Sequence, residues 1–197
     1  LFRSYLEGIA AGMMTKTNKV GFVAGLVGPA IIKVAEGYKL GVQAVNPNCD
    51  VYTAYTGSTE DVQKSKEAAQ AMIDKGVDLI GGGGNASNAG MIKACEEAGV
   101  YAFGELEQQN LAPETVIFCN MNNIENLVLQ AVKDTIDGDF QGCIREYGIS
   151  ADVAQLTEYN SHVPQEVKDK LAECMDQMRS GELDIPMITE ISDDIIH

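Results

Sequence analysis

The feature that most constrains this chain is a regular alternation between short apolar runs and longer segments with helical spacing of apolar residues. Residues 19–25 (KVGFVAG) form an apolar run that ends in glycine, as a buried parallel strand does. Ile31 to Val45 then places its apolar residues on one helical face. The same reasoning predicts further strands at residues 51–55, 77–82, 100–105, 115–121 and 143–149. Strands alternating with helices predict an α/β fold with a doubly wound, mostly parallel sheet.

Amphipathic segments separate these strands. Asn85 to Ala98 is a predicted helix closed by Gly99, and Pro164 to Gly181 is the last helix of the chain. The segment from Ile124 to Gly138 has the clearest amphipathic pattern, with apolar residues at helical spacing along one side. No long linker or internal repeat divides the chain, whose length of 197 residues allows one domain or one and a half.

The charge balance restricts the partners of this chain. Its formal net charge is -15, and its 14 Lys and Arg residues are scattered, whereas nucleic-acid binding requires clustered basic residues. We therefore expect no nucleic-acid partner. No apolar run reaches about 18 residues, so no membrane span is predicted. The chain starts at Leu1 without a charged and apolar leader, as a mature exported protein or a fragment would.

The cysteines indicate neither a disulfide framework nor a metal site. They are odd in number, form no CxxC pair and are accompanied by only two histidines, so we expect no zinc site and no cofactor. We predict buried thiols that act as small apolar residues, compatible with a reducing cytosol or an anaerobe's envelope. The five cysteines are Cys49, Cys95, Cys119, Cys143 and Cys174.

Glycine and uncharged polar residues concentrate where the predicted strands end. In open α/β sheets, ligands bind beyond the carboxyl ends of the strands, and these loops offer backbone amides and oriented side-chain donors and acceptors. For the run from Gly81 to Gly84 two interpretations stand: a loop whose amides face a ligand, or a tight turn that needs positive φ. The residues that we expect to face a ligand are Gly25, Asn85, Ser87, Glu105, Gln108, Asn120 and Asn122.

The same loops carry no recognisable catalytic set. The first strand is not followed by GxGxxG, and no P-loop is present. Glu105 and Glu107 are separated by one residue at the end of the predicted fourth strand, and we interpret them as one pocket acid and one solvated acid, not as an acid/base pair. Neither His162 nor His197 has both a nucleophile and an acid beside it in sequence, and Cys119 is expected in the core. We therefore assign no catalytic residue and expect no enzyme activity.

Five segments give the chain a resemblance to a known family. They span nearly the whole chain in order: residues 4–8 (SYLEG), 14–25 (MTKTNKVGFVAG), 37–47 (GYKLGVQAVNP), 99–104 (GVYAFG) and 163–167 (VPQEV). With the glycine-rich loop, they resemble the basic membrane lipoprotein family, which includes the purine-nucleoside receptors of bacterial ABC transporters. The resemblance implies a type I periplasmic binding protein, in which a ligand is enclosed between two lobes.

The resemblance also implies a division of the chain. Residues 1–119 correspond to the ligand-binding C-terminal-type lobe, and residues 120–142 to a crossover strand end and a helix that packs on a missing first lobe. Residues 143–197 correspond to the return to the ligand-binding lobe and the C-terminal tail. Hinge motion would then occur at crossovers near Gly104 and Asn120. Without the first lobe, the helix from Ile124 to Gly138 would expose an apolar face, a site for a partner lobe or for self-association.

Four positions depart from the nucleoside receptors that the chain resembles. Those receptors typically carry an acid where Val27 stands, an aromatic where Val34 stands, an Asp where Leu106 stands and a Lys where Asn122 stands. These departures weaken the assignment of a purine nucleoside as the ligand. They do not weaken the interpretation as a binding protein, because the residues of a pocket can change within one fold.

The function expected from these observations is the capture of a small polar metabolite, such as a nucleoside, for ABC-type uptake. The transporter permease would be the partner of the full-length protein, which would be extracytoplasmic and anchored to the cell membrane as a lipoprotein; a cytoplasmic location is the alternative. A second hypothesis is a ligand-sensing regulatory module of the same family. A third, less favoured, is an enzyme of sugar or nucleotide metabolism.

Overall fold

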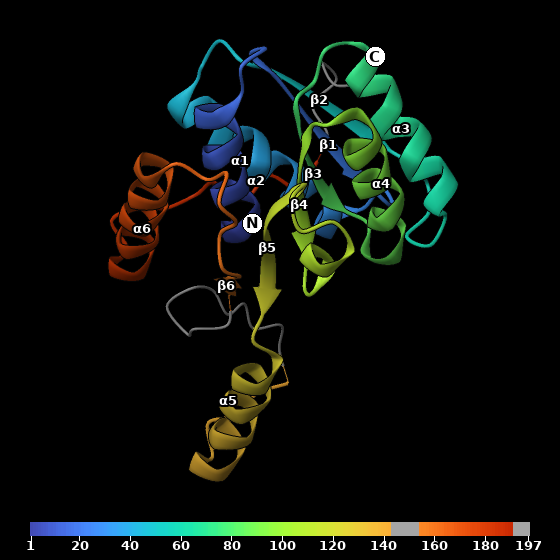
Figure 1. Ribbon diagram of the computed structural model, residues 1–197. Helices are drawn as coiled ribbons and strands as arrows, with labels where there is room; N and C mark the ends of the chain where they lie inside the picture. The colour runs from blue at the N-terminus through green and yellow to red at the C-terminus, as the bar shows by residue number, and fades with distance from the viewer. Residues whose placement is uncertain (143–153, 191–197) are drawn as a thin grey trace.

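The computed structural model describes residues 1–142 and 154–190, and its centre is a six-stranded sheet (Figure 1). The strand order is β2-β1-β3-β4-β5-β6. The first five strands pair in parallel, and β6 runs antiparallel to β5 at the edge. The strands are β1 (Lys19–Ala24), β2 (Asp50–Tyr55), β3 (Leu79–Gly83), β4 (Tyr101–Glu105), β5 (Val116–Asn122) and β6 (Ala154–Leu156).

This topology confirms the predicted fold class, a doubly wound and mostly parallel sheet. Each of the first five predicted strands has a counterpart in the structure. The strand predicted at residues 143–149 lies outside the described residues, and the edge strand that the structure describes is β6 instead. The short β6 was not predicted, because three residues carry too little alternation to be recognised.

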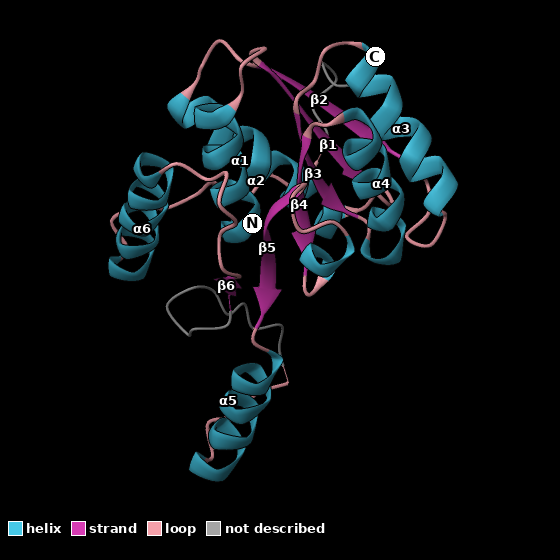
Figure 2. Cartoon of the chain, in the orientation of Figure 1, coloured by secondary structure: helices cyan, strands magenta, loops and turns pink. Residues whose placement is uncertain are grey.

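Helices cover both faces of the sheet (Figure 2). On one face lie α1 and α2, with α6 beside α1; on the other lie α3 and α4. A short helical turn, η1, precedes α4, and another, η2, joins β4 to β5. The helices are α1 (Phe2–Met14), α2 (Pro29–Val45), α3 (Val62–Asp74), α4 (Asn88–Ala98), α5 (Ile124–Asp137) and α6 (Gln165–Ser180), and the turns are η1 (Asn85–Ser87) and η2 (Gln108–Leu111).

Two apolar cores lie on the two faces of the sheet. The core under α1, α2 and α6 contains an aromatic series in which Tyr38 contacts Phe22 and Phe103, and Phe103 contacts Phe118. The core under α3 and α4 is built from smaller residues, among them Met72 and Met91. Because both faces of β1 and β3 are covered, these strands are apolar without alternation, as a central parallel strand requires.

The four cysteines that the structure describes confirm the prediction of buried thiols. Cys49, Cys95, Cys119 and Cys174 are all free and buried. Burial raises the pKa of the Cys95 thiol to about 12 and that of Cys119 to about 11, so both thiols stay protonated at neutral pH. Cys143 lies outside the described residues.

Helix α5 differs from the other helices because it projects from the body of the molecule (Figure 1). Asn123 caps its start by accepting a hydrogen bond from the Asn126 amide, and Gly138 ends it in the left-handed conformation. Its apolar side chains are about half exposed, including Val128 at 55% and Val132 at 49%. In the described part of the chain, no helix has both the length and the apolarity needed to cross a bilayer.

Candidate functional site

The carboxyl ends of the parallel strands meet at one rim of the sheet. The register aligns Ala24 of β1 with Tyr55 and Gly83, and aligns Glu105 of β4 with Asn120 of β5. The strand order reverses between β1 and its neighbours β2 and β3, so the loops after β1 and β3 leave toward opposite faces there. That reversal is where doubly wound folds bind ligands, and the rim is therefore the candidate ligand site.

The loop after β3 is held in a compact conformation by its own polar groups. Asn88 Oδ1 accepts from the Gly84 amide at 3.0 Å, and the Ser87 hydroxyl donates to the Gly84 carbonyl at 2.9 Å. Ser87 is 1% exposed, so its side chain shapes the loop from within. Asn85 is exposed and has a φ of 50°, in the left-handed region that few residues other than glycine and asparagine adopt.

The four-glycine run does not serve as a turn that needs positive φ. None of Gly81 to Gly84 has a φ in the left-handed region, so that interpretation is wrong. These glycines are required by close packing instead: a Cβ on Gly81 would lie 2.9 Å from the Phe22 ring, and one on Gly82 would lie 2.7 Å from Asn88 Oδ1. The other interpretation, that the backbone amides of this loop face a ligand, stays a prediction.

Glu105 joins the loops after β3 and β4. Its Oε2 accepts from the Asn85 amide at 3.1 Å and from Asn88 Nδ2 at 2.9 Å. Gln108 completes the junction, since its Oε1 accepts from the Glu105 amide and its Nε2 donates to the Asn85 carbonyl, each at 2.9 Å. Burial raises the pKa of Glu105, and the hydrogen bond from the Asn85 amide opposes that rise. The structure thus brings Asn85, Glu105 and Gln108 together.

Asn120 links the end of β5 to α1 instead of presenting a free amide. Its Oδ1 accepts from Arg3 Nη1 at 2.9 Å, and its Nδ2 donates to Glu7 Oε1 at 2.7 Å. Glu7 is 1% exposed, and its Oε2 has no hydrogen-bond partner among the described residues. Burial raises the pKa of Glu7 to about 8, so the carboxyl is mostly protonated at neutral pH. Both ends of the Asn120 amide are therefore bonded to α1, and a contact between Asn120 and a ligand stays a prediction.

Of the other two predicted residues, Gly25 follows β1 and Asn122 ends β5. Gly25 is buried, its amide donates to the Gly83 carbonyl at 3.2 Å, and a Cβ there would lie 2.9 Å from Thr59. Glycine at this position lets the loops after β1 and β2 approach closely. Asn122 is exposed at the end of β5, beside the start of α5. A contact between either residue and a ligand stays a prediction.

Sequence reasoning missed three polar residues of the rim: Arg3, Glu7 and Asn88. Glu7 had a usable signal, since it is an acid within an otherwise apolar helical run from Tyr5 to Ala11. Arg3 lies one helical turn before it on the same face. Asn88 had no comparable signal, because an asparagine that opens a helix after a loop is ordinary.

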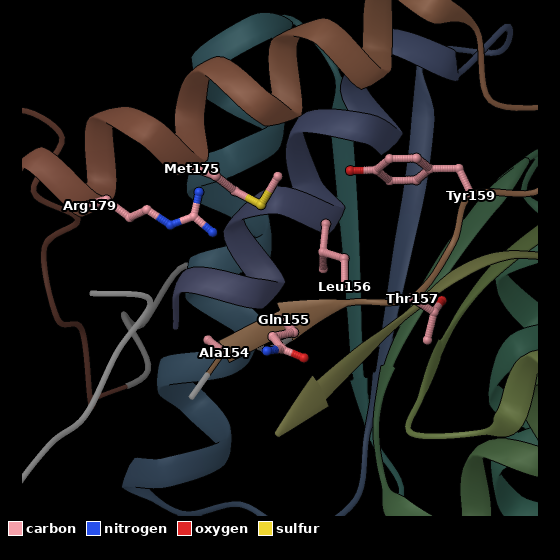
Figure 3. A pocket seen from close by; sticks show the side chains of 7 residues that line it. All are labelled: Ala154, Gln155, Leu156, Thr157, Tyr159, Met175 and Arg179. Carbon is pink, nitrogen blue, oxygen red and sulfur yellow. The ribbon is translucent and has the colours of Figure 1, made fainter. Parts of the chain in front are cut away.

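A separate cavity of about 320 Å³ lies between β6, the segment that follows it, and α6 (Figure 3). Tyr159 and Arg179 approach Met175 from opposite sides of it. The Arg179 guanidinium is already paired with Asp176 at 3.3 Å, on the surface of α6. The lining residues are Ala154, Gln155, Leu156, Thr157, Tyr159, Met175 and Arg179, and none of them is a predicted ligand residue.

A family model described as "ABC transporter substrate-binding protein PnrA-like" matches residues 3–189, almost the whole chain. The chain belongs to this family. Its resemblance to the basic membrane lipoproteins is thereby confirmed.

Two curated relatives illustrate the range of this PnrA-like family. The chain is 31% identical to the CD4+ T-cell-stimulating antigen of Listeria monocytogenes, over 93% of this chain and 56% of the relative. It is 26% identical to a purine-binding protein of Brucella abortus, over 91% of this chain and 51% of the relative. The chain thus spans about half the length of these relatives.

Solved structures share the fold. A transcriptional activator of the comK gene from Bacillus halodurans superposes with a TM-score of 0.83 at 23% identity, covering 92% of this chain and 63% of that structure. An ABC transporter solute-binding protein from Conexibacter woesei superposes with a TM-score of 0.80 at 24% identity, covering 95% of this chain and 63% of that structure. Both likenesses confirm the fold of a lobe of a periplasmic-binding-protein-like molecule.

Proposed function

We propose that this chain is the ligand-binding lobe of a solute-binding protein, which captures a small polar metabolite, such as a nucleoside, for ABC-type uptake. The observation that carries this proposal is the rim, where the loops after β3 and β4 are locked together by Glu105 and Gln108. A preorganised set of amides and carboxylates binds a polar solute at little entropic cost. Membership of a substrate-binding family supports the same function.

The proposal includes a two-lobed full-length protein. Residues 1–119 and 143–197 would form this lobe, and residues 120–142 would carry α5 onto a first lobe. Two observations support this: the curated relatives are about twice as long, and α5 projects with its apolar side chains exposed. The cleft would close about crossovers near Gly104 and Asn120, over the rim. The full-length protein would be an extracytoplasmic lipoprotein that delivers its ligand to a transporter permease.

A nucleoside is the favoured ligand class because one relative is a purine-binding protein. The residues that depart from nucleoside receptors do not block the rim, since Val27 and Leu106 are 61% and 51% exposed. The lobe would bind its ligand without reacting with it. Among the described residues, His162 contacts Glu114 and takes no part in the rim contacts, and the Cys119 thiol stays protonated. His197 lies outside the described residues.

Ligand-observed NMR on the 197-residue chain tests this function with inosine, adenosine and glucose as probes. We expect at least one nucleoside to bind with a Kd in the millimolar range, because one wall of a cleft keeps only part of the contacts. The nucleoside spectrum should stay unchanged over hours. Conversion of a nucleoside to product would contradict a binding function, and micromolar binding would contradict the two-lobed site.

Glu105→Ala is the site variant for this test. It removes the acceptor that joins the two loops, so we expect nucleoside affinity to fall by about tenfold or more. Glu173→Ala, which removes an exposed carboxylate on α6, is the matched control and should bind as the parent chain does. Equal affinity of both variants would place the ligand away from the rim.

A second candidate function is a ligand-sensing module. The transcriptional activator from Bacillus halodurans shares the fold, and the exposed face of α5 offers a surface through which a sensor could report to a partner. The two functions predict different cellular locations. A transport receptor is exported and carries a lipid-modified N-terminus in its full-length form, and a cytoplasmic sensor does not. Fractionation of the full-length protein therefore distinguishes them.

A further inference from the structure

Arg3 places a guanidinium beside the end of β5, and most of its donors have no partner among the described residues. It lies in the first turn of α1 and is partly buried. Within the described residues its side chain makes one hydrogen bond, from Nη1 to Asn120 Oδ1 at 2.9 Å, and no ion pair within 4 Å. A guanidinium carries five N–H donors and no acceptor. Arg3 can therefore donate several hydrogen bonds to a ligand and accept none.

Asn120 and Glu7 hold Arg3 in place. The Asn120 amide is fixed at both ends, because its nitrogen donates to Glu7 Oε1 at 2.7 Å while its oxygen accepts from Arg3. Glu7 lies one helical turn after Arg3 and is itself 1% exposed, so it cannot swing away. Glu7 and Asn120 are positioning residues, and Arg3 is the residue of this set that can meet a ligand.

Two carboxyl groups act electrostatically on Arg3, first Glu7 and then Glu105. Burial raises the pKa of Glu7 to about 8, so Glu7 contributes little negative charge at neutral pH. Glu105 acts on Arg3 electrostatically, and it accepts hydrogen bonds from Asn85 and Asn88 as a carboxylate does. With Arg3 already opposed by Glu105, and with a net charge of -15 on the chain, the site favours a neutral acceptor over an anion.

Resting on the proposed function, we propose that Arg3 selects the ligand by its hydrogen-bond acceptors, so that purine nucleosides with a 6-oxo group are bound in preference to those with a 6-amino group. The 6-oxopurine edge presents two adjacent acceptors, O6 and N7, which match the paired donors of a guanidinium. Adenosine presents an amino donor at the same position, which repels an N–H donor. Arg3 therefore discriminates between two ligands of nearly identical shape.

Calorimetric or NMR titration of the 197-residue chain with inosine and with adenosine tests this selection. We expect inosine to bind about tenfold more tightly than adenosine, the effect of one hydrogen bond to a charged donor. Arg3→Met should bring the two affinities within about twofold of each other by weakening inosine binding. Arg3→Lys, which keeps the charge but loses the paired donors, should retain only part of the preference.

Arg179→Met is the matched control, because it makes the same change in the separate cavity beside α6. It should leave the preference for inosine intact. The thermal unfolding of each variant is measured alongside, and the guanidinium NMR signals of Arg3 in the parent chain provide a readout that needs no variant. These signals should shift with inosine and not with ribose.

The outcomes separate this inference from the function on which it rests. Equal affinity for inosine and adenosine, or a preference that survives Arg3→Met, overturns the role of Arg3 while nucleoside binding still supports the proposed function. If Arg179→Met abolishes the preference for inosine, the ligand binds in the cavity beside α6, and the role of Arg3 is overturned as well. If no nucleoside binds the parent chain, the nucleoside function fails, and this inference fails with it.

Discussion

Glu7 is the residue whose surroundings are least expected from its chemistry. A carboxyl group that is 1% exposed and holds one hydrogen bond, from Asn120, sits in a helix packed between α2, α6 and the sheet. Its raised pKa follows mainly from lost hydration, and the Asn120 hydrogen bond offsets only part of that loss. The neutral form is the one that this packing accommodates.

Glu7 should therefore make the chain less stable as pH rises. Its pKa is about 8 when folded and about 4.5 when unfolded, so the folded state binds more protons in between. The free energy of unfolding should fall as pH rises through that window and level off above it. Glu7→Gln, which mimics the protonated form, should remove this part of the slope and stabilise the chain at pH 9 by about 2 kcal/mol or more. Urea unfolding at several pH values measures both effects.

The control for this prediction is Glu173→Gln, which changes a 53% exposed carboxylate on α6. Its pH profile should follow that of the parent chain. A Glu7→Gln profile that also follows the parent chain would mean that Glu7 ionises freely in the folded state.

Glycines set how closely the helices pack. Gly8 of α1 faces the Tyr38 carbonyl of α2, and Gly41 of α2 faces the Tyr5 carbonyl of α1, with no room for a Cβ at either site. On the other face of the sheet, Gly90 of α4 lies against the Val62 carbonyl of α3 in the same way. Each pair of helices therefore approaches backbone to backbone, a contact that helical periodicity of apolar residues does not reveal.

Gly41→Ala should consequently destabilise the chain. Its Cβ would overlap the Tyr5 carbonyl and lie 3.0 Å from the Ile9 nitrogen, both of them backbone atoms that cannot rotate away. We expect the free energy of unfolding to fall by about 1–3 kcal/mol or more, as measured by chemical denaturation. Gly142→Ala is the control: its φ lies outside the left-handed region and no atom lies within 4 Å of the added Cβ, so its effect should stay below about 0.5 kcal/mol. Similar losses in both variants would show that α1 and α2 can separate at little cost.

At the scale of the whole molecule, α5 decides how the chain behaves in solution. Its sequence is amphipathic, as that of a helix packed on one face is, yet its apolar residues Val128, Leu129 and Val132 are about half exposed. Ile136 is exposed to a larger extent, at 79%. An exposed apolar helix face of this kind packs against a first lobe in a longer protein, or against another apolar surface when no such lobe is present.

The 197-residue chain should therefore self-associate through α5. Sedimentation velocity over increasing protein concentration should show a reversible rise in apparent mass. A double variant with Val128→Glu and Val132→Glu should stay monomeric, because charges on the apolar face of α5 oppose its burial. Val62→Glu, at a 45% exposed position on α3, should associate as the parent chain does. A monomeric parent chain at high concentration would contradict this prediction.

The sequence by itself determined the α/β class, the parallel strands β1 to β5 and the burial of the four described cysteines. Apolar runs and helical spacing record these features locally, because each strand or helix must bury its own face. It also placed Asn85, Glu105 and Gln108 at the same rim. Only the tertiary structure decided that Asn120 is held by Arg3 and Glu7, that the glycine run serves close packing, and that α5 projects from the body. Those facts depend on contacts between residues as distant as Arg3 and Asn120, which no local pattern records.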